Sequence, residues 1–106
     1  MNQLNSVLIE GRIHKAAESR VVGGITVLKF TIASTRYDNN KEIDVVYIDI
    51  EVWGKIDGGY SGAVEEGRDV RVVGRLKQNQ VYDSENKVSF KQIVIVAEHI
   101  EFKEAY

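Results

Sequence analysis

Residues 45–55, with the sequence VVYIDIEVWGK, indicate the fold of this chain because apolar positions alternate with polar and aromatic ones. The apolar positions are Val46, Ile48, Ile50 and Val52. A period of two predicts a β-strand with one buried face. The opposite face carries Asp49 and Glu51 between two large rings, Tyr47 and Trp53. The run therefore poses a question: why would two aromatic rings face outward?

The length and composition are those of one small domain. The chain has 106 residues, 43% hydrophobic and 28% charged, which is typical of neither a disordered nor a membrane protein. No apolar run approaches the roughly 20 residues of a membrane-spanning helix. Cysteine is absent, which excludes disulfides and thiolate chemistry. We therefore expect a single domain over residues 1–106, without a membrane partner or leader peptide, in the cytoplasm.

Period-two patterns recur in four further segments, which we predict to be strands. These segments are residues 6–16, 25–34, 69–77 and 88–102. Turn signals separate them at VVGG, YDNNKE and YDSENK. Val46 and Leu76 are among the side chains expected to point inward, and residues 93–96 are apolar on both faces, as in a strand covered twice. Gly11 and Gly74 interrupt two strands where we expect sharp bends.

Five strands with glycine-marked bends favour an all-β fold, the five-stranded Greek-key OB barrel. Between the third and fourth strands, residues 56–67 read IDGGYSGAVEEG. Their apolar spacing suits a short helical insertion, although the internal glycines disfavour a regular helix. OB barrels bind oligonucleotides or oligosaccharides on the face of strands two and three and on neighbouring loops.

No constellation of residues indicates catalysis. The only histidines, His14 and His99, have no nucleophile at a helpful spacing, and no glycine-rich phosphate loop is present. We interpret both as surface or structural residues. No spacing supports a metal site either. We therefore predict no enzymatic activity, no catalytic residues, no metal and no cofactor.

Aromatic and basic side chains instead suggest a stacking surface for a polyanion. Some aromatic residues are expected to lie outside the core, because they stand at outward positions of a strand or in a loop. They are Tyr37, Tyr47, Trp53, Tyr82 and Phe90. The candidate phosphate contacts are Lys29, Arg36, Lys55, Arg71, Arg75, Lys77, Lys87 and Lys91. Taken singly, each could be an ordinary exposed side chain. Together they fit a single strand of nucleic acid, whose bases stack on rings and whose phosphates meet cations.

Five segments, in this order, resemble the bacterial-type single-stranded DNA-binding proteins: NSVLIEGRI, TVLKFTIASTRY, EVWGK, GRDVRVVGRLK and IVAEHIEF. The resemblance covers roughly residues 3–102 and implies an OB barrel. It implies sequence-independent binding of single-stranded DNA during replication, recombination and repair, at the bacterial nucleoid. It also implies stacking roles for Tyr37, Tyr47, Trp53 and Tyr82. Family members associate as homotetramers through strand one and sheet faces.

Two departures qualify the resemblance. Asp49 and Glu51 would repel phosphate unless a cation such as Arg71, Arg75 or Lys77 pairs with them, or unless they lie in a subunit interface. We therefore expect binding that is weaker and more salt-sensitive than in a typical member. The acidic C-terminal tail through which the family recruits repair enzymes does not follow Tyr106. We accordingly do not expect tail-mediated recruitment.

Two alternative functions remain open at this point. The first is a primosomal replication protein, a short OB dimer that binds single-stranded DNA together with a helicase or its loader. The second is an OB module that binds protein or oligosaccharide. The formal net charge of −2 supports this second alternative, because a nucleic-acid-binding domain is more often basic, and so does the acidic pair Asp49 and Glu51 on the outward side of its strand.

Overall fold

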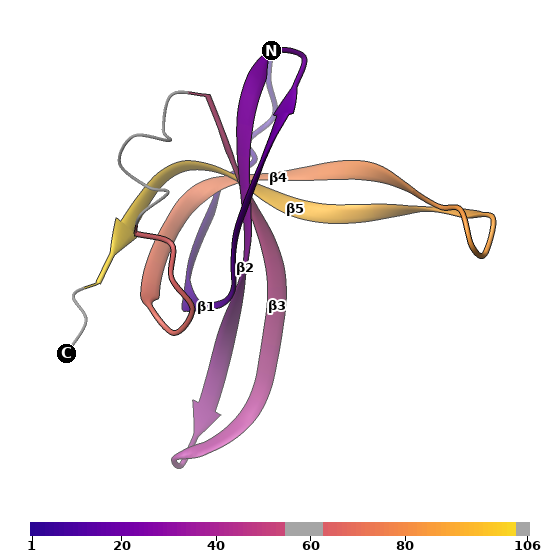
Figure 1. Cartoon of the computed structure of the whole chain (residues 1–106). Coiled ribbons are helices and arrows are strands. Elements are labelled where there is room, and N and C mark those ends of the chain that lie inside the picture. Colours follow the sequence, from indigo (N-terminus) through magenta and orange to yellow (C-terminus); the bar gives the residue numbers. More distant parts are fainter. Residues whose placement is uncertain (55–62, 104–106) are drawn as a thin grey trace.

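The chain folds into a closed five-stranded β-barrel in the computed structural model, which describes residues 1–54 and 63–103 (Figure 1). The strands are β1 (Val7–Val22), β2 (Ile25–Asp38), β3 (Lys41–Trp53), β4 (Asp69–Asp83) and β5 (Val88–Phe102). Around the barrel their order is β1-β2-β3-β5-β4, and β4 pairs back with β1. Among the strands of the described residues, only β3 and β5 pair in parallel. The predicted all-β, five-stranded OB fold is confirmed.

The helical insertion expected between the third and fourth strands is not seen in the described residues. Residues 55–62 lie outside that part of the chain, and residues 63–68 form turns and irregular backbone. Gly67 adopts a φ of 87°, a left-handed value that ends any helical run. Within residues 1–54 and 63–103, no helix is long and apolar enough to cross a membrane.

The core takes most of its side chains from the inward positions of the strands. Phe30 on β2 and Ile50 on β3 are fully buried at its centre. The other buried members are Ile13, Leu28, Ile32, Val52, Val64, Val70, Val72, Ile95, Ala97 and Ile100. β5 is also buried on its second face, where Val94 and Val96 are inaccessible or nearly so. The expectation of a doubly covered strand is therefore correct for residues 94–96 but wrong for Ile93, which is 46% exposed.

Two further predictions of buried positions are wrong. Val46 is 49% exposed and Leu76 is 43% exposed, although both stand at alternating positions that face the inward side of their strands. The physical reason is that the strands are longer than the barrel is deep. The β2–β3 hairpin and the β4–β5 hairpin both extend past the barrel, where the inward side of a strand no longer meets a core (Figure 1).

The two interior glycines allow neighbouring backbones to approach closely. A Cβ on Gly11 would lie 2.8 Å from the carbonyl oxygen of Ala33, and a Cβ on Gly74 would collide with the carbonyl oxygen of Val96. Gly74 also stands at a register shift between β4 and β5. A side chain at either position would require the neighbouring backbone to shift, which explains the two glycines by close strand contact. The sharp bends expected at these residues stay a prediction.

Candidate nucleic-acid interface

The outward side of β2 and β3 carries the two rings of the period-two run, Tyr47 and Trp53. Tyr47 stands opposite Ala33, and Trp53 stands opposite Val27. Because side chains alternate along a strand, both rings lie on the same side of β3 as Asp49 and of the sheet as Lys29. We call this side the outer face, and include the β4 and β5 side chains that contact it. Tyr47 is 58% exposed, whereas Trp53 is half-buried.

Asp49, between the rings, is fully engaged by its neighbours. Its Oδ1 accepts a hydrogen bond from the Thr31 hydroxyl at 2.7 Å, and its Oδ2 accepts one from the Gln92 amide at 2.9 Å. The Lys29 ammonium lies 3.4 Å from the same Oδ2. This carboxylate therefore presents a paired rather than a free negative charge.

Glu51 is the buried charge of the outer face, with a relative exposure of 2%. Its Oε1 accepts a hydrogen bond from the Trp53 indole at 3.0 Å, and its Oε2 accepts one from the Asn79 amide at 2.7 Å. The Lys77 ammonium lies 3.5 Å from Oε1 and 4.6 Å from the centre of the Trp53 ring. Lys77, one of the cations predicted to pair with these carboxylates, thus pairs with Glu51.

The environment of Glu51 keeps it ionised at neutral pH. Burial alone would raise the pKa of this carboxyl. Hydrogen bonds from Trp53 and Asn79, together with the charge of Lys77, outweigh burial and hold the pKa below its ordinary value. The outer face therefore contains a stable ion pair instead of an isolated charge.

A β-bulge brings two unanticipated residues of β1 next to Tyr47. The register of β1 against β2 shifts between Ile13 and Lys15, which places Lys15 opposite Thr31 on the outer face. His14, the extra residue of the bulge, lies with its ring centre 4.9 Å from that of Tyr47. His14 and Lys15 line a depression together with Thr31, Tyr47 and Asp49. Simple alternation from Ile13 would have turned Lys15 inward, so the sequence pattern missed it.

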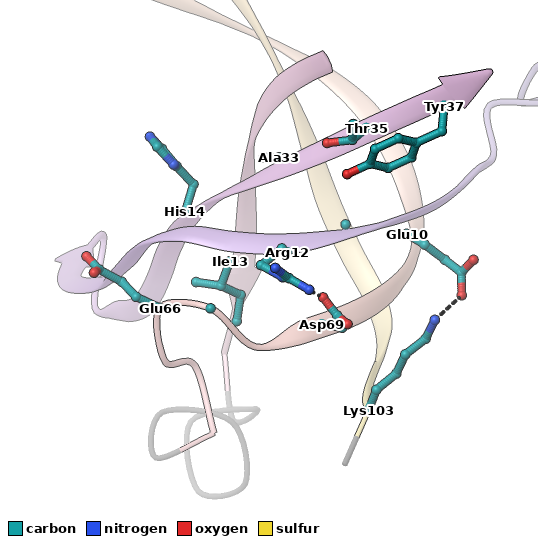
Figure 2. A pocket seen from close by; sticks show the side chains of 12 residues that line it. Glu10, Arg12, Ile13, His14, Ala33, Thr35, Tyr37, Glu66, Asp69 and Lys103 are labelled. Atoms are coloured by element: carbon teal, nitrogen blue, oxygen red, sulfur yellow. Dashed lines mark hydrogen bonds and ion pairs between the residues drawn. The ribbon is translucent and has the colours of Figure 1, made fainter. Parts of the chain in front are cut away.

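Tyr37 lies farther along β2, beside a larger groove that runs between β1 and β2 (Figure 2). Tyr37 is 66% exposed and lines this groove with Thr35 and His14. The groove also holds two ion pairs, Arg12 with Asp69 at 3.0 Å and Lys103 with Glu10 at 3.0 Å. Because His14 lines both hollows, the groove at Tyr37 and the depression at Tyr47 adjoin.

The two remaining candidate rings lie on opposite faces of the β4–β5 hairpin. Val81 stands opposite Phe90, whereas Tyr82 stands opposite Ser89. Gln92 donates a hydrogen bond to Asp49 and lies two residues from Phe90 on β5, so both side chains are on the same face. Phe90 therefore shares the outer face with Tyr47, while Tyr82 points the other way.

The candidate phosphate contacts are not all equivalent. Arg71 lies on the β1–β4–β5 side of the barrel, where it pairs with Glu10 at 3.0 Å and with Glu101 at 3.6 Å. Arg75 stands opposite Val96 and is exposed. The other exposed candidates are Arg36, Lys87 and Lys91. Because side chains alternate along β5, Lys91 lies on the same face of the hairpin as Tyr82. Lys55 lies outside the described residues.

Within residues 1–54 and 63–103, no group of acidic or histidine side chains could hold a metal ion.

An OB barrel whose outer face combines exposed rings with basic side chains belongs to the oligonucleotide-binding class of proteins. The chain is a member of the single-strand binding protein family, whose model matches residues 4–103. The family resemblance seen in the sequence is therefore confirmed, and single-stranded DNA binding is the function that membership supports. It supports a binding protein and not an enzyme.

The fold matches the crystal structure of a small single-stranded DNA-binding protein from Streptomyces coelicolor. The two structures superpose with a TM-score of 0.75 over 97% of this chain and 96% of that chain, at 20% sequence identity. At that identity the likeness establishes the fold. No significant match was found among curated protein sequences.

Proposed function

We propose that the protein binds single-stranded DNA without sequence preference, by stacking bases on Tyr47 and Trp53 of the outer face, and so protects unpaired strands in replication, recombination and repair. The observation that carries the proposal is the position of both rings on one side of β3, with the carboxylates between them already paired. Stacking needs only the π-face that every base has, so it tolerates any sequence.

The path of the strand extends beyond these two rings. The depression beside Tyr47 adjoins the groove that Tyr37 lines, which suits a continuous strand crossing His14. Phe90 extends the same face in the other direction, along β5. Tyr82, on the reverse side of its hairpin, contributes least in this proposal.

The phosphates are contacted from the edges of this path. Lys15 is exposed beside Tyr47, and Arg75 is exposed opposite Val96, two residues along β4 from Lys77. Lys29 and Lys77 already neutralise Asp49 and Glu51. Fewer cations are then free to contact phosphate than the sequence alone suggests. Since each neutralised phosphate steepens the log–log salt dependence by about 0.7 for single strands, we infer a shallow dependence instead of a steep one.

Fluorescence anisotropy of a labelled oligo-dT tests this function. We expect the anisotropy to rise and saturate as the protein is added at low salt, and an unlabelled duplex of equal length to compete poorly. If the duplex competed as well as the single strand, stacking on unpaired bases would be contradicted, because the faces of paired bases are covered by their neighbours in the helix.

We further propose that the protein acts as a homo-oligomer, a tetramer or a dimer, in the bacterial cytoplasm with the nucleoid. Leu8 on β1 is 68% exposed on the side where β1 pairs with β4, which suits burial by a second copy. Light scattering distinguishes the two states. A tetramer supports the single-stranded DNA-binding protein assignment, and a dimer supports the primosomal alternative.

The protein- or oligosaccharide-binding alternative loses its main support at the outer face. It rested partly on Asp49 and Glu51 as exposed acidic residues. Both are paired, and Glu51 is buried.

A further inference from the structure

We propose that Glu51 is a positioning residue for DNA: it fixes the edge of the Trp53 ring and holds Lys77 over one ring face, so that a base stacks on the opposite face only. This inference rests on the proposed function of the outer face. It assigns Lys77 to the support of Trp53 and removes it from the phosphate contacts.

A single carboxylate oxygen organises the ring and the cation. Glu51 Oε1 accepts from the indole Nε1 of Trp53 at 3.0 Å and lies 3.5 Å from the ammonium of Lys77. The ammonium is also 4.6 Å from the ring centre, within the range of a cation–π interaction. Ring and cation are therefore fixed relative to each other, because both are bound to the same atom.

The carboxylate itself has little freedom to move. Glu51 is 2% exposed, and Asn79 binds its second oxygen at 2.7 Å. Asn79 and Lys77 belong to β4, whereas Glu51 belongs to β3, and β5 pairs with both strands. The Glu51 side chain thus spans β5, over its buried residues Val94 and Val96. A side chain anchored across three strands can orient a ring far better than an exposed one.

The charges decide what Lys77 can do. Its ammonium faces a full negative charge on Glu51 and the negative face of the indole. A phosphate would have to displace the carboxylate, leaving an unpaired charge buried. A phosphate contact by Lys77, which would release a condensed counterion of the DNA, is therefore unfavourable while Glu51 is ionised.

The salt dependence of oligo-dT binding tests the proposal in the wild type, Glu51→Gln, Lys77→Gln and the double variant. Glutamine keeps an oxygen for the Trp53 indole but removes the charge that holds Lys77. We expect Glu51→Gln to steepen the log–log slope by about 0.7, the value for one added phosphate contact. Lys77→Gln and the double variant should keep the wild-type slope.

Lys77 is part-exposed, so its substitution also serves if Glu51→Gln folds poorly. A slope that becomes shallower by about 0.7 in Lys77→Gln would identify Lys77 as an ordinary phosphate contact and overturn the proposal. An unchanged slope in a folded Glu51→Gln would overturn it as well.

Trp53 fluorescence provides the readout of ring position. We expect Glu51→Ala, which removes the acceptor of the indole, to reduce the quenching that bound oligo-dT causes, whereas Glu51→Gln retains it. Glu101→Ala is the control, because Glu101 pairs with Arg71 and His99 and has no contact with Trp53 or Lys77 in the described residues. Equal quenching in Glu51→Ala and the wild type would refute the positioning role. Failure of the wild type itself to bind oligo-dT would instead refute the proposed function.

Discussion

The rings of His14 on β1 and Tyr47 on β3 lie 4.9 Å apart between centres, with their planes inclined by 59°. β2 pairs with both strands, so the two rings meet across it. A tilted aromatic pair of this kind contributes about 0.5–1.5 kcal/mol beyond the area it buries. The contact restricts Tyr47, which would otherwise be an exposed ring free to change rotamer, and so prepares it for a base.

Replacing His14 by Ala should therefore weaken oligo-dT binding without unfolding the protein. We expect a loss of about 0.5–1.5 kcal/mol in binding free energy, measured by anisotropy, because Tyr47 loses its ring partner. In a Tyr47→Ala background the same replacement should have almost no further effect. Additive losses would show that His14 acts independently of Tyr47.

Replacing Tyr47 by Ala should reduce affinity for oligo-dT by about 1–3 kcal/mol, the contribution of one stacked base. Thermal stability should change little, since the ring is 58% exposed. Tyr82→Ala is the matched control, because Tyr82 is 65% exposed but lies on the reverse of its hairpin. Equal losses in both variants would argue against the outer face as the specific site.

Stability should fall in acid as Glu51 takes up a proton. The folded pKa of Glu51 lies below its unfolded value of about 4.5, so ionisation stabilises the fold above that pH. This contribution is lost as the pH falls through the folded pKa. Chemical denaturation between pH 7 and pH 3 should show a smaller acid loss in Glu51→Gln than in the wild type. The pKa of Glu10 is also lowered, by Lys103 and Arg71. Protonation of Glu10 should therefore still destabilise the Glu51→Gln variant in acid.

Adding a methyl group at Gly74 should destabilise the barrel where β4 meets β5. A Cβ there collides with the backbone carbonyl of Val96, and backbone cannot move aside as a flexible side chain can. We expect Gly74→Ala to cost about 1–3 kcal/mol in the free energy of unfolding. Gln78→Ala, an exposed change on the same strand, should stay within about 0.5 kcal/mol. A Gly74→Ala protein of unchanged stability would contradict the close packing of the two strands.

Alternation along the strands predicted the strands and the outward rings, whereas the prediction of the barrel also used the strand count, the interior glycines and the family resemblance. Alternate residues of the run around Ile50 lie on two sides of the sheet, as the pattern requires, although Glu51 on the outer side is itself buried. Strand ends were less predictable. Val46 and Leu76 stand at inward positions of the alternating pattern. The pattern does not indicate where the barrel ends and a protruding hairpin begins.

The candidate site was predictable only in part because its remaining features depend on register. The bulge at His14 reverses the parity of Lys15, and no local signal in the sequence marks it. Tyr82 and Phe90 come close in the chain, yet the pairing of Val81 with Phe90 separates their faces. The partners of Asp49 and Glu51 come from other strands, which a pattern along one strand cannot identify.

Titration of Trp53 fluorescence with oligo-dT tests most directly whether the outer face binds DNA. Trp53 is the only tryptophan in the sequence, so its emission reports on this face alone. We predict saturable quenching at low salt, with Tyr47→Ala shifting the midpoint to higher oligo-dT concentration. Saturable binding by anisotropy with no change in Trp53 emission would contradict stacking at this face and would place the DNA elsewhere on the barrel.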